Sequence, residues 1–281
     1  MIFFKIDNYP NTLQKSMQTK GDMPQFGWCG HPAQAVLMQQ AGVDYFEGQL
    51  APMQLEDDSA FANAKAQIRD LALPARAFNM LFPASLKIVG PEKDTRRNRN
   101  YFDRVAVLLA IAKTDILVLG SGASRNIPAG WTVEQAEADF LSTLTWCTEG
   151  LQGLETTLVI EPLNRKESSL INSIADGIRL AKIFNHPQVR ALADFFHMDQ
   201  ESEPLDVLSR DTDWLAHIHL ADTGRQNPGT GSYDYGSFFR NIKQGGYCGR
   251  LSVEGHIKGD PLTAMRESLD FLRHAWLHSH A

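Results

Sequence analysis

The chain has 281 residues, of which 43% are hydrophobic and 21% are charged, an ordinary composition for a globular protein. This length is enough for one large α/β barrel or for two smaller domains. The formal net charge of −6 repels the phosphates of DNA and RNA, so we expect no nucleic-acid partner.

Short apolar runs alternate with amphipathic segments from about residue 26 onward. Proline or glycine and polar residues bound the runs, a pattern typical of buried strands. The runs predict strands at Phe26–Cys29, Tyr45–Glu47, Arg76–Met80, Ile116–Leu119, Thr157–Ile160, Val189–Asp194, Leu215–Leu220 and Leu251–Val253.

The segments between these runs predict helices. Asp94, Thr132 and Asp260 precede three of them as N-cap residues, and Pro261 suits the first helical position. The predicted helices are 32–41, 59–72, 95–113, 132–150, 169–184, 204–210, 235–244 and 261–277. Strand–helix alternation of this length predicts one closed parallel (β/α)8 barrel of the α/β class over residues 26–281. An open doubly wound sheet is the alternative, and the lack of a GxGxxG turn after the first strand disfavours it.

Cellular context follows from what the sequence lacks. Its three cysteines are far apart and form no CxxC pair, which suits a reducing cytosol. No run approaches the length of a membrane-spanning helix, and the first residues do not form a signal peptide. We therefore expect a cytoplasmic protein with no membrane partner. Residues 1–25 are interpreted as an N-terminal extension that packs on the barrel or on a neighbouring subunit.

A barrel of this type places its chemistry at the carboxyl ends of its strands. The fifth to eighth predicted strands end at or just before four polar residues: Glu161, Asp194, His219 and Glu254. Three carboxylates brought together repel one another, and a divalent cation removes that repulsion. Oxygen-rich ligands favour Mn²⁺ or Mg²⁺, with Co²⁺ or Zn²⁺ as alternatives.

Glu47, at the end of the second predicted strand, is a candidate to bind substrate hydroxyls. Ser121, Gly122 and Arg125 are candidates to bind a polar substrate tail.

These motifs resemble the xylose isomerase-like barrel superfamily, and within it the sugar isomerases and epimerases of the D-tagatose 3-epimerase and hydroxypyruvate isomerase type. The resemblance rests on VIEPLNRKE, LADFFHM, HIHLADTGR, PGTGSYDYGSF and GYCGRLSVEGH, which follow in this order. It covers the second half of the chain well and the first half more loosely. It implies carbohydrate metabolism, one divalent metal ion, a small sugar or keto-polyol substrate, and a homo-oligomer, either a dimer or a tetramer.

The resemblance also implies roles for individual residues. Glu161, Asp194, His219 and Glu254 match the metal ligands, and Glu161 and Glu254 also match the pair of catalytic acid/base carboxylates. His197, Arg225 and Glu167 match residues that contact substrate. The implied reaction is proton transfer through an enediolate, and the ligand set does not decide between epimerisation and isomerisation.

Two other reactions remain open on the same ligands. A metal-dependent dehydratase or lyase would expel a hydroxyl group from the enediolate of a keto-inositol or keto-sugar. An endonuclease IV-like phosphodiesterase would need further histidines for a three-zinc cluster. The third and fourth predicted strands end instead near Asn79 and at Gly120, which disfavours the nuclease.

Overall fold

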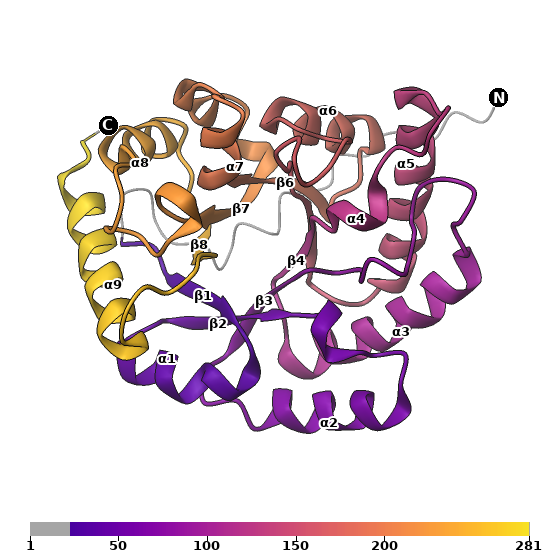
Figure 1. Ribbon diagram of the computed structural model, residues 1–281, viewed down its shortest axis with the longest axis horizontal. Helices are drawn as coiled ribbons and strands as arrows, with labels where there is room; N and C mark the ends of the chain where they lie inside the picture. Colours follow the sequence, from indigo (N-terminus) through magenta and orange to yellow (C-terminus); the bar gives the residue numbers. More distant parts are fainter. Residues whose placement is uncertain (1–22, 281) are drawn as a thin grey trace.

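A computed structural model describes residues 23–280 of the chain. Eight parallel strands follow one another round a closed barrel, and β8 pairs with β1. Helices surround the barrel, as Figure 1 shows. The strands are β1 (Phe26–Gly30), β2 (Tyr45–Gln49), β3 (Ala75–Asn79), β4 (Ile116–Leu119), β5 (Thr157–Ile160), β6 (Val189–Asp194), β7 (Leu215–Leu220) and β8 (Arg250–Val253). The predicted (β/α)8 barrel is confirmed. The proposed extension, residues 1–25, lies mostly outside the described residues.

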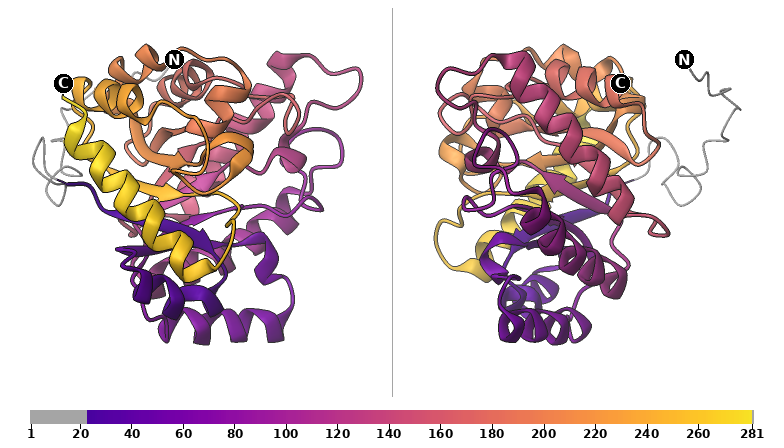
Figure 2. Two further views of the ribbon diagram at one scale, coloured as in Figure 1. Left: turned by 60° about the vertical axis from the view of Figure 1, so that its left-hand side comes forward. Right: turned by 90° about the vertical axis from the view of Figure 1, so that its right-hand side faces the viewer.

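The outer layer contains the helices that connect successive strands. Figure 2 shows the last of them, α9, crossing the side of the barrel, where it contacts both α8 and α1 and so closes the ring. The long helices are α1 (Ala35–Ala41), α2 (Asp58–Arg69), α3 (Thr95–Ala112), α5 (Val133–Gly150), α6 (Ile174–Phe184), α8 (Tyr235–Gln244) and α9 (Pro261–His278). No helix among residues 23–280 is long and apolar enough to cross a membrane.

The predicted N-caps are confirmed where they hold the first turns. The side chains of Asp94, Thr132 and Asp260 each accept a hydrogen bond from the backbone N–H three residues later. Each bond satisfies one of the N–H groups that a helix start leaves without a partner.

Two helical predictions differ from the structure. The segment predicted as a helix at 204–210 forms a 3₁₀ helix, η4 (Leu205–Ser209), and the turn of α-helix lies earlier, in α7 (Phe195–Gln200). The helix predicted from residue 169 begins at Ile174, because Ser173 is its N-cap and accepts a hydrogen bond from the backbone N–H of Asp176. A further short helix, α4 (Gly122–Arg125), follows β4.

The barrel interior is a small separate core, distinct from the larger core between strands and helices. It contains Tyr45, Ala77, Ile116, Val118, Val159 and Leu192, all buried. Side chains alternate along a strand, so the next inward position lies two residues further on. Strand pairing aligns Cys29 with Glu47 and His219 with Asp194. The positions that follow the interior core form what we call the inward ring: Cys29, Glu47, Asn79, Gly120, Glu161, Asp194, His219 and Glu254.

Candidate metal centre and substrate site

The four predicted metal ligands come together in one half of the inward ring. Glu161, Asp194, His219 and Glu254 each place one ligand atom within 4.8 Å of the others. Glu161, Asp194 and His219 are buried, and Glu254 is partly buried. Residues 93 positions apart in the sequence therefore meet because parallel strands end at the same edge of the barrel.

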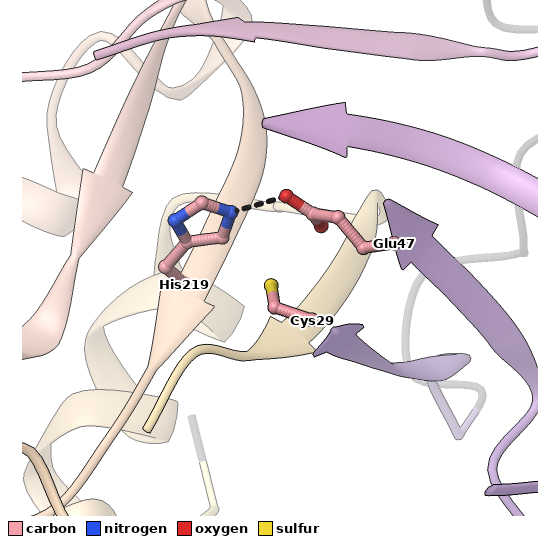
Figure 3. A group of neighbouring side chains, drawn as sticks. All are labelled: Cys29, Glu47 and His219. Atoms are coloured by element: carbon pink, nitrogen blue, oxygen red, sulfur yellow. Dashed lines mark hydrogen bonds and ion pairs between the residues drawn. The ribbon is translucent and has the colours of Figure 1, made fainter. Parts of the chain in front are cut away.

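His219 lies at the centre of this group. Its Nδ1 atom is 3.0 Å from Oε1 of Glu161 and 3.0 Å from Oε2 of Glu254. Its Nε2 atom is 2.8 Å from Oε1 of Glu47, an interaction drawn in Figure 3. Burial disfavours the charged imidazole, but Glu47 and Glu254 outweigh burial and raise the pKa of His219 well above its usual value. The position facing Nδ1 is therefore strongly favourable for positive charge.

Glu47 belongs to the other half of the inward ring and is completely buried. One oxygen faces His219, and the other lies 2.8 Å from Nε2 of His217. Burial alone would raise the pKa of Glu47, but the two histidines hold it below its usual value. Figure 3 shows the Cys29 thiol pointing toward Glu47 and His219. Histidines engage both carboxylate oxygens of Glu47, and its predicted contact with substrate hydroxyls stays a prediction.

Asp194 is fixed by the start of α7. Its Oδ1 atom accepts hydrogen bonds from the backbone N–H groups of Phe196 at 2.7 Å and His197 at 3.1 Å. Its Oδ2 atom points toward the other three candidate ligands and lies 3.8 Å from Nδ1 of His219. One oxygen thus holds the side chain in place, and the other is available as a ligand.

Glu161 and Glu254 are shifted in opposite directions. Burial raises the pKa of Glu161, although His219 opposes this shift. Burial also acts on Glu254, but His219 and Arg225 outweigh it and lower the pKa of Glu254 to about 2. Two carboxylates whose environments separate their pKa values suit one proton acceptor and one proton donor.

The donor set fits a divalent cation. Four buried or partly buried carboxylates, those of Glu47, Glu161, Asp194 and Glu254, face the side chains of His219 and Arg225. Three of these carboxylates and Nδ1 of His219 converge on one point. Carboxylate oxygens with one imidazole match the ligands that Mn²⁺ and Mg²⁺ take in proteins.

The predicted substrate-contacting residues lie together beside this group. Arg225 donates from Nη2 to Oε2 of Glu254 at 2.8 Å and from Nη1 to Oε1 of Glu167 at 3.3 Å. The same Nη1 is 3.4 Å from Nε2 of His197. Sequence reasoning missed Asn164, whose amide nitrogen contacts both Nδ1 of His197 at 2.8 Å and Glu167 at 3.0 Å. Its place three residues after Glu161 was the only available signal.

Arg125 does not bind a substrate tail, because its side chain is fully buried. Its guanidinium donates to the backbone carbonyls of Leu119 at 3.2 Å and of Glu161 at 2.7 Å. Burial lowers the pKa of Arg125 to about 10, so the group stays charged at neutral pH. Arg125 instead joins the ends of β4 and β5 just behind Glu161.

Gly120 leaves room for Glu161 in the inward ring. A Cβ atom at Gly120 would lie 2.1 Å from Oε2 of Glu161. We expect Gly120→Ala to displace this carboxylate and weaken Mn²⁺ binding about 10-fold, a typical loss when the support of a ligand is disturbed. Isothermal titration with Mn²⁺ measures this change. Gly236→Ala on α8 is the control, since its Cβ meets nothing closer than 3.4 Å. Equal Mn²⁺ affinities of Gly120→Ala and Gly236→Ala would show that a Cβ atom at position 120 does not displace the Glu161 carboxylate.

Comparison with known proteins places the chain in a family. Residues 36–275 match the family described as "Xylose isomerase-like TIM barrel". A 3-dehydro-D-guloside 4-epimerase of Escherichia coli (strain K12) is 37% identical over 120 residues, 42% of this chain and 46% of that protein. A D-psicose 3-epimerase of Ruminiclostridium cellulolyticum is 25% identical over 180 residues, 62% of this chain and 61% of that protein. The chain thus matches less than two thirds of the length of these relatives.

Solved structures show the same fold. The 3-keto-D-glucoside 4-epimerase of E. coli superposes with a TM-score of 0.76 at 23% identity, over 90% of this chain and 100% of that one. A D-allulose 3-epimerase from Methylomonas sp., in complex with D-allulose, gives 0.77 at 18% identity, over 92% and 99%. The family match extends over most of the barrel and includes all four residues of the candidate metal centre. The chain belongs to the xylose isomerase-like TIM barrel family.

Proposed function

We propose that the protein is a divalent-metal-dependent epimerase or isomerase of keto sugars. The observation that carries the proposal is the placement of Glu161 and Glu254. Each carboxylate lies 3.0 Å from Nδ1 of His219, within the group of four candidate metal ligands. Two carboxylates beside one cation can act as the base that removes a proton next to a carbonyl and as the acid that returns it. The activities named for the relatives support the same class of reaction.

In the proposed reaction, Glu161 and Glu254 exchange a proton with the substrate carbon. One carboxylate removes the proton α to the carbonyl, which leaves the enediolate of the sugar, and the other returns a proton. A divalent cation would act as a Lewis acid and polarise the carbonyl. Arg225 and His197 are placed to donate to the oxygen on which negative charge develops. Return to the opposite face of the same carbon gives epimerisation, and return to the neighbouring carbon gives isomerisation.

Mn²⁺ is the metal that we propose first, with Mg²⁺, Co²⁺ and Zn²⁺ as alternatives. The test is metal titration combined with incubation in D₂O of a panel of ketoses, 3-keto-glycosides and keto-inositols. We expect metal-dependent deuterium incorporation at the carbon next to the carbonyl. Loss of a hydroxyl group from the product would instead identify a dehydratase. Absence of exchange with every compound would reject the proposal.

Glu47 has a positioning role in this proposal. It orients His219 by accepting from Nε2, so that Nδ1 faces the cation. We expect Glu47→Gln to weaken Mn²⁺ binding about 10-fold, because the neutral amide no longer stabilises the correct orientation of the ring. Calorimetric titration measures this. Glu56→Gln, which removes an exposed partner of Arg97, is the control and should bind Mn²⁺ like the wild type. Unchanged binding in Glu47→Gln would remove the positioning role.

The nuclease alternative finds no support in the inward ring. The positions on β3 and after β4 that would supply histidines are Asn79 and Gly120. The predicted homo-oligomer and the cytoplasmic location remain predictions.

A further inference from the structure

Asn79 reaches across the mouth of the barrel to the acid/base pair. It ends β3 and is 1% exposed, and its Nδ2 atom donates to Oε1 of Glu254 at 3.0 Å. The two residues come from strands that do not pair, because β1 and β2 lie between β3 and β8. The amide of Asn79 therefore lies inside the inward ring, next to the carboxylate of Glu254.

The other half of the same amide lacks a partner. Oδ1 of Asn79 is buried and has no hydrogen-bond partner among residues 23–280. The amide cannot turn round, because its oxygen would then face a carboxylate that only accepts. A buried acceptor without a donor is costly, and native proteins retain few of them.

Arg225, Tyr45 and His219 direct their donors at groups other than Asn79. Arg225 donates to Glu254 and Glu167, and the hydroxyl of Tyr45 lies 2.7 Å from that of Ser252. The nitrogens of His219 face carboxylates. A sugar hydroxyl bound beside Glu254 has the chemistry to supply the donor that Oδ1 of Asn79 lacks among residues 23–280.

We propose that Asn79 both positions Glu254 and selects the substrate. Its Nδ2 atom holds Oε1 of Glu254, which leaves Oε2 directed at the cation position beside His219. Its Oδ1 atom accepts a hydrogen bond from a hydroxyl group of the keto sugar, next to the carbon that exchanges its proton. The enzyme thus favours substrates that carry this hydroxyl over the corresponding deoxy sugars. This selection rests on the proposed function, whereas the positioning of Glu254 does not.

Two variants separate the two roles. Asn79→Leu removes donor and acceptor at similar volume, and Asn79→Asp keeps an acceptor but places a carboxylate against Glu254. Asn98→Leu is the matched control, because Asn98 on α3 is also 1% exposed and its Oδ1 also lacks a partner among the described residues. Thermal unfolding of all three shows what the loss of a buried amide does to stability alone.

The first measurement is Mn²⁺ affinity by calorimetric titration, which needs no substrate. We expect Asn79→Leu to bind Mn²⁺ about 10-fold more weakly than the wild type, as variants that lose the support of a ligand typically do. Asn98→Leu should bind like the wild type. If Asn79→Leu binds Mn²⁺ within twofold of Asn98→Leu, Asn79 does not position Glu254.

The second measurement compares a ketose with its monodeoxy analogues, using deuterium exchange in the Mn²⁺-loaded enzyme. In the wild type, removal of one particular hydroxyl should lower kcat/KM about 3- to 10-fold, the effect of one hydrogen bond between uncharged groups. The same removal should have no effect in Asn79→Leu and should retain its effect in Asn98→Leu. If every deoxy penalty is equal in Asn79→Leu and Asn98→Leu, Oδ1 does not bind the substrate.

The two proposals fail in distinguishable ways. Wild-type enzyme that binds Mn²⁺ but exchanges no sugar rejects the proposed function, and substrate selection by Asn79 with it. The Mn²⁺ comparison still decides whether Asn79 positions Glu254. Exchange by the wild type with equal deoxy penalties rejects selection and leaves the proposed function standing.

Discussion

Replacing either Glu161 or Glu254 by Gln should stop interconversion of the substrate and its product almost completely. Each change removes a proton-transfer group and a charged ligand at once, and we expect turnover to fall by about 10³-fold or more. The fold should persist, because Gln has nearly the same shape. Circular dichroism and thermal unfolding check the fold, and product analysis measures turnover.

Asp194→Asn separates the loss of the metal from the loss of the acid/base group. Asp194 is a proposed ligand without a proposed proton-transfer role, so excess Mn²⁺ should restore much of its activity. Excess Mn²⁺ should not restore either glutamate variant. If it restores Glu161→Gln or Glu254→Gln to the wild-type rate, the two-carboxylate mechanism is wrong.

Deuterium exchange sharpens this test for an epimerase. Glu161 and Glu254 would act on opposite faces of one carbon, so each variant keeps a single functional base. Each variant should exchange the proton of one epimer only, and the two variants should act on different epimers. Exchange of the same epimer by both variants would place the two carboxylates on the same face and favour an isomerase.

The strands and the meeting of the four candidate ligands could be predicted from the sequence because they depend on local patterns. Each apolar run is bounded by polar or turn-forming residues, and Glu161 follows its run directly. Parallel strands in a barrel all end at the same edge, so four residues at strand ends were expected to meet. The structure brings these four residues together.

The supporting contacts could not be predicted, because they depend on how the barrel closes. The bond between Asn79 and Glu254 joins strands that do not pair, and the register shifts at Phe46/Glu47 and Ala191/Leu192. No local pattern encodes these shifts. The sequence showed that Glu47 lies at a strand end. It did not show the two histidine partners of Glu47, because these contacts also depend on how the barrel closes.

Arg125 was misinterpreted because an arginine in a short polar segment usually lies at the surface. Because Arg125 is fully buried, its replacement is the second change for which we expect a large effect. Arg125→Met should lower the free energy of unfolding by about 3 kcal/mol, because the carbonyls of Leu119 and Glu161 would remain buried without their donor. Removal of the buried charge offsets part of this loss, and about 3 kcal/mol is the net effect. Urea denaturation measures the change.

Arg99→Met is the matched control, because Arg99 makes an exposed ion pair with Glu149 and such pairs contribute at most about 1 kcal/mol. A loss in Arg125→Met no larger than in Arg99→Met would show that water or a shift of the backbone replaces the guanidinium. Mn²⁺ affinity gives a second readout, since Arg125 holds the carbonyl of the residue whose side chain is a proposed ligand. If Arg125 fixes the end of β5, Arg125→Met should bind Mn²⁺ more weakly even at temperatures where it is fully folded. A purely stabilising role would leave that affinity unchanged.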